Sequence, residues 1–138
     1  MCGIFSIINN KNNSSKDSNK IIKEDLIESS FYKGKNRGPE QSSLHHYEGI
    51  VLGFHRLAIN GLNAISNQPI IINDVILVCN GEIFNYKELY KLINVSPVTN
   101  SDCEVIIHLY MKYGIEQTLN MLDGEFAFLL LDNRISNN

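Results

Sequence analysis

The sequence predicts an α+β fold with mainly antiparallel sheets, and three observations lead to this prediction. Apolar, β-branched runs and helical patterns are mixed along the chain without a repeated strand–helix–strand unit. Two stretches combine an apolar run, a turn signal and a second apolar run, which is typical of β-hairpins. At 138 residues the chain is long enough for one domain with its own core, and no linker-like segment divides it.

In the first half of the chain, apolar stretches alternate with polar and turn-forming residues. The predicted elements, in order, are a buried strand at 2–8, a polar loop at 9–19, a helix at 20–34, a turn at 36–40 and a hairpin at 42–59. The helix is expected to bury Ile22, Leu26 and Phe31 and to end at Gly34. The hairpin is expected to turn near residues 48–49.

The second half continues the mixture of strands and helices. The predicted elements are a loop at 60–69, two strands within 70–81, helices at 85–93, 101–114 and 115–122, and a strand at 125–132. The two strands are expected to turn at residues 73–74, and a second sharp turn is expected at residues 80–81. Ser101 and Glu104 have the spacing of a capping box, and Gly114 is expected to end that helix.

Composition excludes several classes of function. A formal net charge of −3 gives no general attraction to nucleic acid or to an anionic membrane. The apolar runs are too short to span a bilayer, and no signal-peptide pattern is present. Cys2, Cys79 and Cys103 are odd in number and lack C-x-x-C spacing, which favours a reducing cytosol over a disulfide framework. No metal-ligand spacing joins the cysteines and histidines.

Cys2 is the first candidate for chemistry. If Met1 is removed, Cys2 carries both a thiol and a free α-amine, whose ordinary pKa of about 7.7–8.0 leaves part of it unprotonated at neutral pH. A terminal amine of this kind can act as general base for its own side chain. The other interpretation is a small cysteine buried at the start of a strand.

Five further positions could complete such a site, and each also has an ordinary structural explanation. Asn80 and Gly81 can form an oxyanion hole or merely a hairpin turn. Arg56 can hold a carboxylate or extend along an apolar edge towards solvent. Asp102 can pair with a substrate ammonium or serve as a favourable charge in a first helical turn, and Glu82 can add to that negative site or lie in solvent.

The histidines offer a rival arrangement, a Cys–His pair of the protease type. The candidates are His45, His46, His55 and His108. No feature of the sequence pairs any of them with a cysteine. Cys79 and Cys103 are expected to be small buried side chains.

Taken together, seven stretches occur in an order that resembles class II glutamine amidotransferases. They are "MCGIF", "NRGPE", "GFHRLAI", "NQPI", "CNGEIFNY", "SDCEVIIHLY" and "MLDGEFAFLLLD". "RGPE", "NQP" and "NGEIFN" more narrowly resemble the N-terminal glutaminase domain of glutamine-hydrolysing asparagine synthetases. The resemblance covers nearly the whole chain.

This resemblance implies an N-terminal-nucleophile αββα sandwich with two mainly antiparallel sheets. It implies Cys2 as nucleophile with its α-amine as base, and Asn80 with Gly81 as the oxyanion hole. The remaining implied contacts are Arg56 to the α-carboxylate of glutamine, Asp102 and Glu82 to its α-amino group, Ile59 and Asn60 in the pocket wall, and Arg37 as a lid or support residue. Asn60 departs from the family, which usually has an apolar residue there.

The resemblance also implies what the chain does and what it lacks. Residues 1–138 are expected to be a partial glutaminase domain, incomplete at its C-terminus, without the synthetase domain. The expected reaction is hydrolysis of glutamine to glutamate and ammonia, as the glutaminase part of a cytoplasmic ligase of asparagine biosynthesis. No cofactor is expected in this chain, since ATP and Mg²⁺ belong to the missing domain. The expected partners are glutamine and either a synthetase chain or further copies of this one, with no nucleic acid and no membrane.

Two alternatives remain open at this point. The chain could be a non-catalytic module that binds glutamine or a partner without turnover. It could also be an N-terminal-nucleophile hydrolase of another amide, although Arg56 and Asp102 together suit a free amino acid.

Overall fold

The computed structural model describes residues 2–8 and 24–134. Its strands are β1 (Gly3–Ile8), β2 (Gln41–Tyr47), β3 (Ile50–Arg56), β4 (Ile70–Ile72), β5 (Val75–Ile83) and β6 (Gly124–Asp132). Its helices are α1 (Glu24–Tyr32), α2 (Tyr86–Ile93) and α3 (Val105–Met121), with short 3₁₀ turns at Lys35–Arg37, Ala64–Ser66 and Asp102–Glu104. Both predicted hairpins are present, β2–β3 and β4–β5.

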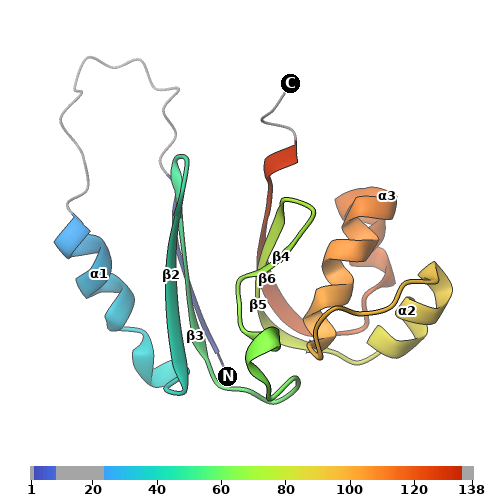
Figure 1. Ribbon diagram of the computed structural model, residues 1–138, viewed down its shortest axis with the longest axis horizontal. Helices are drawn as coiled ribbons and strands as arrows, with labels where there is room; N and C mark the ends of the chain where they lie inside the picture. Colours follow the sequence, from blue (N-terminus) through green and yellow to red (C-terminus); the bar gives the residue numbers. More distant parts are fainter. Residues whose placement is uncertain (1, 9–23, 135–138) are drawn as a thin grey trace.

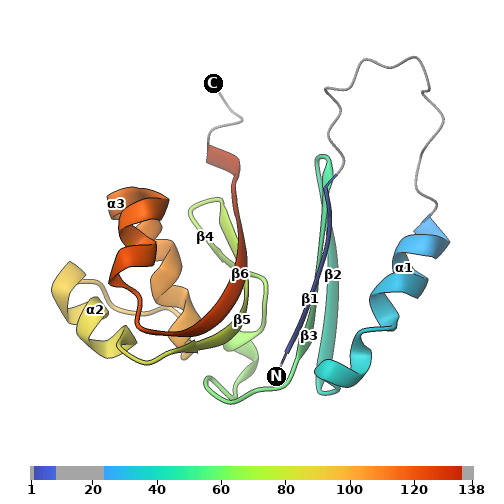
Figure 2. The same cartoon turned by 180° about the vertical axis from the view of Figure 1, so that it is seen from behind.

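The elements form four layers, which Figures 1 and 2 show from opposite sides. One antiparallel sheet has the order β1-β3-β2, and the other has the order β4-β5-β6. The sheets face each other, α1 covers the outer face of the first, and α2 and α3 cover the outer face of the second. The predicted α+β class with mainly antiparallel sheets is confirmed.

Strand register decides which side chains of the first sheet lie between the layers. Phe31 of α1 stacks on His55 with ring centroids 4.1 Å apart, so His55 lies on the helix-facing side of β3. Because side chains alternate along a strand, Phe54 and Arg56 lie on the opposite side, towards the second sheet. Gly3 of β1 pairs with His55, which places Cys2 next to Arg56 at the end of the same inner face.

The second sheet is organised in the same way around β5. Its residues Val75, Leu77, Cys79 and Ile83 are buried in the core beneath α2 and α3. The alternate residues Asn80 and Glu82 therefore lie on the opposite side, towards the first sheet. Residues from both sheets that matter for the site consequently share the space between the layers.

The structure corrects the predicted inner face of the first helix. Leu26 is largely exposed at 57%, whereas Ile27 and Phe31 are buried. Residues 27 and 31 are four apart and share a helix face, but residues 26 and 31 are five apart and do not. Ile22 and the polar loop at 9–19 lie outside the described residues.

The expected turn at Asn80-Gly81 is absent, because β5 continues through both residues to Ile83. Asn80 pairs with Ala127 and Gly81 pairs with Phe126 of β6. The Asn-Gly dipeptide is typical of hairpin turns, but here the apolar residues on both sides pair with a neighbouring strand and extend it.

The predicted helices after β5 are present with two local differences. Ser101 caps its turn by accepting a hydrogen bond from the Cys103 N–H, but Glu104 does not complete a capping box and instead binds the backbone of Val98 and Thr99. Gly114 has non-helical torsions and divides α3 where a helix end was predicted. Within the described residues, no helix combines the length and apolar character needed to cross a bilayer.

Candidate active site

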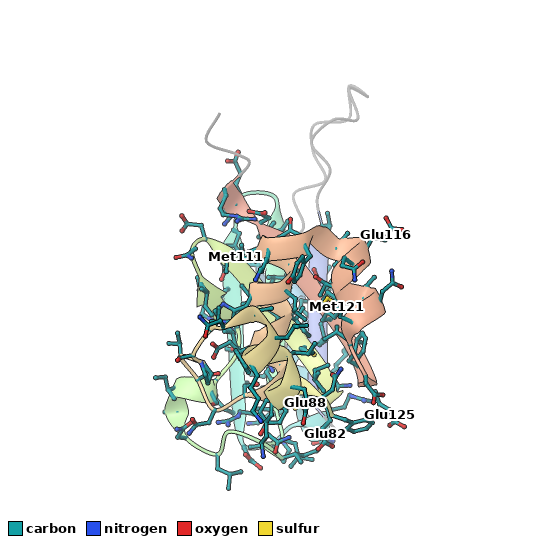
Figure 3. All side chains as sticks on the ribbon, turned by 90° about the vertical axis from the view of Figure 1, so that its right-hand side faces the viewer. Glu82, Glu88, Met111, Glu116, Met121 and Glu125 are labelled. Atoms are coloured by element: carbon teal, nitrogen blue, oxygen red, sulfur yellow. The ribbon has the colours of Figure 1, made fainter. Side chains whose placement is uncertain are left out.

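A cavity of about 340 Å³ lies between the sheets at the end where β1 begins and β5 ends. All eight side chains or backbone positions predicted for catalysis and glutamine binding line it: Cys2, Arg56, Ile59, Asn60, Asn80, Gly81, Glu82 and Asp102. Figure 3 labels Glu82 and Glu125, which lie close together at this end of β5 and β6. The structure therefore brings together residues that are up to a hundred positions apart in the sequence.

The Cys2 thiol is held where the β1–β3 pairing ends. Its Sγ donates to the Leu57 carbonyl at 3.2 Å and lies 3.3 Å from the Leu57 nitrogen, whose N–H points at the sulfur. The thiol is half-buried and free, so it can reach a molecule in the cavity. The contacts with the Leu57 backbone fix the position of the sulfur at the edge of the cavity.

The "RGPE" turn braces the segment around this cysteine. The Arg37 Nε donates to the Cys2 carbonyl at 3.2 Å, and Glu40 bonds to the backbone of both Arg56 and Ala58. Gly38 lies so close to β3 that a Cβ there would be 2.2 Å from the His55 oxygen, so no larger residue fits. Arg37 does not line the cavity, which fits its predicted support position rather than a contact with substrate.

Gly81 presents a backbone N–H at an open edge of β5. The Cys79 N–H bonds to the Gln68 side chain and the Ile83 N–H to Asp102, while the Phe84 N–H points to Asp123 on the β6 side. Because N–H directions alternate along a strand, the Gly81 N–H points the same way as those of Cys79 and Ile83, away from β6. Strand β4 does not extend that far, so this N–H faces the cavity.

Gly81 also cannot be replaced by a larger residue without moving β6. A Cβ at this position would be 2.3 Å from the Glu125 oxygen and 2.5 Å from the Phe126 Cα. The Asn80 side chain, on the face of β5 that looks towards the first sheet, supplies a second donor to the same cavity. The pair can therefore act as an oxyanion hole from within a strand.

Asp102 is the buried acid of the cavity. It is only 3% exposed, accepts the Ile83 N–H at 2.6 Å and accepts a side-chain hydrogen bond from Asn60. Burial raises the pKa of Asp102, the two hydrogen bonds oppose that rise, and the nearby charge of Glu82 adds to it. A carboxylate that is costly to ionise, with a second carboxylate beside it, is well suited to a ligand cation.

Arg56 lies on the opposite wall and is 9% exposed. Its guanidinium donates to the Asn67 side chain and to the Gly61 carbonyl, which fixes its orientation. These bonds use two of its five N–H donors, and the others remain for a ligand carboxylate. Arg56 and Asp102 thus place opposite charges on two sides of one cavity.

The rival Cys–His pair finds no support in the described residues, where no histidine lines the cavity. His55 bonds to Ser42 and to the Phe31 carbonyl on the far side of β3. His46 lies near Glu24, and His108 bonds to Glu104. Each of these three rings already has a structural partner away from Cys2.

Several cavity residues were not predicted from the sequence. They include Ser66, Gln68, Phe84, Glu125 and the two buried cysteines, Cys79 and Cys103. The cysteines are buried as expected; they contact each other, and both residues contribute to the lining of the cavity. Gln68 lies within the "NQP" stretch used for the resemblance, which was the only available signal for it.

Comparison with known proteins agrees with this geometry. Residues 1–137 match the model of the glutamine amidotransferase domain family, and the chain belongs to that family. It is 42% identical to asparagine synthetase (glutamine-hydrolyzing) 2 of Arabidopsis thaliana, and 40% identical to the asparagine synthetases (glutamine-hydrolyzing) of Zea mays and Sandersonia aurantiaca. Each alignment covers 97% of this chain, but only 22%, 22% and 25% of those proteins. The resemblance drawn from the motifs is confirmed.

Proposed function

We propose that this chain hydrolyses the side-chain amide of glutamine to glutamate and ammonia. The observation that supports this most strongly is that one cavity holds the Cys2 thiol, the Gly81 N–H, and the opposite charges of Arg56 and Asp102. A nucleophile, an oxyanion donor and a reader for a free amino acid are the parts that this reaction needs.

The first half of the reaction forms a γ-glutamyl thioester. The α-amine of Cys2, free once Met1 is removed, takes the thiol proton, and the sulfur attacks the amide carbon. The Asn80 side chain and the Gly81 N–H stabilise the oxyanion that results. The ammonium of Cys2 then gives its proton to the leaving nitrogen, the C–N bond breaks, and ammonia departs. Met1 itself lies outside the described residues.

The second half uses water. The same α-amine takes a proton from a water molecule, which attacks the thioester carbon, and the same donors stabilise the second oxyanion. The C–S bond breaks, glutamate forms, and the thiol recovers its proton. This sequence uses only groups of the chain and water, so we propose that it needs no metal or cofactor.

Substrate choice follows from the charges around the cavity. Arg56 is proposed to bind the α-carboxylate through its unused N–H donors, and Asp102 with Glu82 to bind the α-ammonium. Ile59 and Asn60 form the mouth of the cavity, where both are exposed. Asn60 also bonds to Asp102, which gives its unusual polar side chain a place in holding the acid. An amide without these two end groups would leave both charges unpaired, which disfavours the alternative hydrolase.

The wider role is proposed from the relatives, which are named as asparagine synthetases. The ammonia released here would then serve asparagine formation in the cytoplasm, with ATP and Mg²⁺ chemistry supplied by a synthetase domain, a companion chain or another part of the same assembly. We propose that the chain alone does not carry out that second step, since no stretch of it resembles a nucleotide-binding loop.

The test of the proposal is ammonia and glutamate release from glutamine by the Met1-free chain, compared with Cys2→Ala. We expect turnover only with the thiol present. Calorimetry with glutamine on both proteins separates the alternative, because a non-catalytic module would bind glutamine with the same affinity in both and release no ammonia in either.

A further inference from the structure

The open edge of β5 is fixed on both sides of Gly81 by side chains rather than by a strand. On one side, the Gln68 amide accepts the Cys79 N–H at 2.5 Å and donates to the Cys79 carbonyl at 2.9 Å. On the other side, Asp102 accepts the Ile83 N–H at 2.6 Å. Only the peptide unit of Gly81 lies between these two attachments.

From this we infer that Gln68 is a positioning residue that aims the oxyanion hole. The inference rests on the proposed function and concerns a residue to which nothing above assigns a part in the reaction. Gln68 does not bind substrate in this account. It acts by holding the Cys79 peptide, and through it the next two residues, Asn80 and Gly81.

The chemistry of the side chain explains why a glutamine serves here. A primary amide has a donor and an acceptor side by side, so it pairs with a peptide group as another strand residue would. β4 begins only at Ile70, and the Gln68 side chain therefore continues the pairing of β5 one step beyond the end of β4. Gln68 is 9% exposed, so water cannot readily replace these bonds.

A second attachment links this residue to the sheet that carries Cys2. The backbone carbonyl of Gln68 accepts a hydrogen bond from the Ser43 Oγ of β2 at 2.7 Å. The side chain of the neighbouring residue, Asn67, accepts a hydrogen bond from Arg56. Gln68 thus connects β5 with the nucleophile's sheet on the wall of the cavity. Loss of these hydrogen bonds would move the oxyanion donors relative to the thiol. Stabilisation of the transition state is sensitive to such a movement.

The first test separates kcat from KM for glutamine. Gln68→Met keeps the length of the side chain and removes both hydrogen bonds. We expect kcat to fall on the order of 10–100-fold, the scale for a misplacement of about 1 Å. KM should stay within about twofold, because Arg56 and Asp102 are retained. An unchanged kcat, or a change in KM alone, would overturn the inference.

Gln68→Glu provides a signature that a purely structural role would not produce. The ionised carboxylate still accepts the Cys79 N–H but cannot donate to the Cys79 carbonyl, whereas the protonated carboxyl can. The kcat of this variant, as a ratio to the unsubstituted chain at the same pH, should therefore rise as the pH falls. The other ionisable groups of the cavity are common to both proteins and cancel in the ratio: Arg56, Glu82, Asp102, Glu125, Cys2, Cys79 and Cys103. A flat ratio contradicts the inference.

Amide hydrogen exchange gives a result that does not depend on activity. The Cys79 amide should exchange faster in Gln68→Met, while that of Ile83 keeps its protection from Asp102. Thr118→Val is the matched control, since it removes another hydrogen bond of a buried side chain, to the Gly114 carbonyl within α3, and should leave both kcat and Cys79 exchange unchanged. Unchanged Cys79 exchange in Gln68→Met overturns the inference, whereas absence of ammonia release from the unsubstituted chain overturns the proposed function instead.

Discussion

Arg56 allows the binding half of the proposed site to be tested separately. A guanidinium can hold a carboxylate with two parallel N–H donors, and an ammonium cannot. In Arg56→Lys we expect KM for glutamine to rise by on the order of 10–100-fold, since a charged hydrogen bond contributes roughly 1.5–3 kcal/mol. Steady-state kinetics with glutamine measures this. A variant with unchanged KM would remove Arg56 from the carboxylate site.

Asn80 tests the chemical half. Asn80 lines the cavity beside Gly81. We propose that its side chain donates a hydrogen bond to the oxyanion and not to the ground-state substrate. Asn80→Ala should lower kcat by on the order of 10²–10³ with little change in KM, which is the usual effect of removing one oxyanion donor. Normal turnover in this variant would exclude Asn80 from the oxyanion hole.

At the scale of residues, the sequence was sufficient where the motif itself contains the functional group. Cys2, Arg56, Asn80 and Asp102 were each predicted with an ordinary structural alternative, and the structure places all four in one cavity. Gln68 could not be predicted in the same way. Its importance depends on β4 beginning only at Ile70, and no local pattern shows where a strand lacks a neighbour.

The segment between α2 and α3 is held by one buried acid. Glu104 is fully buried and accepts hydrogen bonds from the Val98 and Thr99 N–H groups at 2.8 and 2.5 Å and from His108 at 2.9 Å. Burial opposes ionisation, but these hydrogen bonds outweigh it and lower the pKa of Glu104 to about 2. Asp102, which lines the cavity, lies two residues before Glu104, so the hydrogen bonds of Glu104 also help to position Asp102.

Glu104→Gln tests this attachment through its pH dependence. The pKa of Glu104 is lower in the folded chain than its ordinary 4.5, so its carboxylate stabilises the fold above that pH and loses this effect as the pH falls towards about 2. The variant should be less stable at pH 7 by roughly 1.5–3 kcal/mol. The difference in unfolding free energy between the two proteins, from urea titrations, should shrink between pH 4.5 and 2. A constant difference contradicts the attribution.

At the scale of elements, periodicity predicted which segments are strands and helices, but not where they end or turn. The order and type of the elements follow from apolar runs such as 70–72 and 75–79, which the structure confirms as β4 and most of β5. The turn expected at residues 80–81 failed because pairing with β6 overrides the local preference of Asn-Gly. Tertiary pairing of this kind is not encoded in a local window.

At the scale of the whole molecule, β6 is an edge strand of the second sheet. Within the described residues it pairs only with β5, so its other edge carries unpaired backbone groups. Phe126, Phe128 and Leu130 pack against the helical core from this strand and remain partly exposed. A long apolar edge strand is a template for pairing with another chain.

We therefore predict that the isolated chain is marginally stable and associates with itself or with a companion chain. Light scattering after size exclusion should show a mass that rises with concentration. Leu131→Lys, which places a charge on β6 next to Ile76, should reduce this association. A chain that is monomeric at all concentrations and has a sharp unfolding transition would show that the edge of β6 neither causes association nor destabilises the fold.

The central claim is that Cys2 acts with its own α-amine. The most direct measurement is the mass of the N-terminal peptide after the chain has been mixed with glutamine and quenched during turnover, for Met1-free and Met1-retaining protein. The account predicts a γ-glutamyl group on the Cys2 thiol and ammonia release from the Met1-free chain only, because retained Met1 moves the amine one residue away. Equal activity in the Met1-retaining chain, or a γ-glutamyl group on another residue, would contradict it.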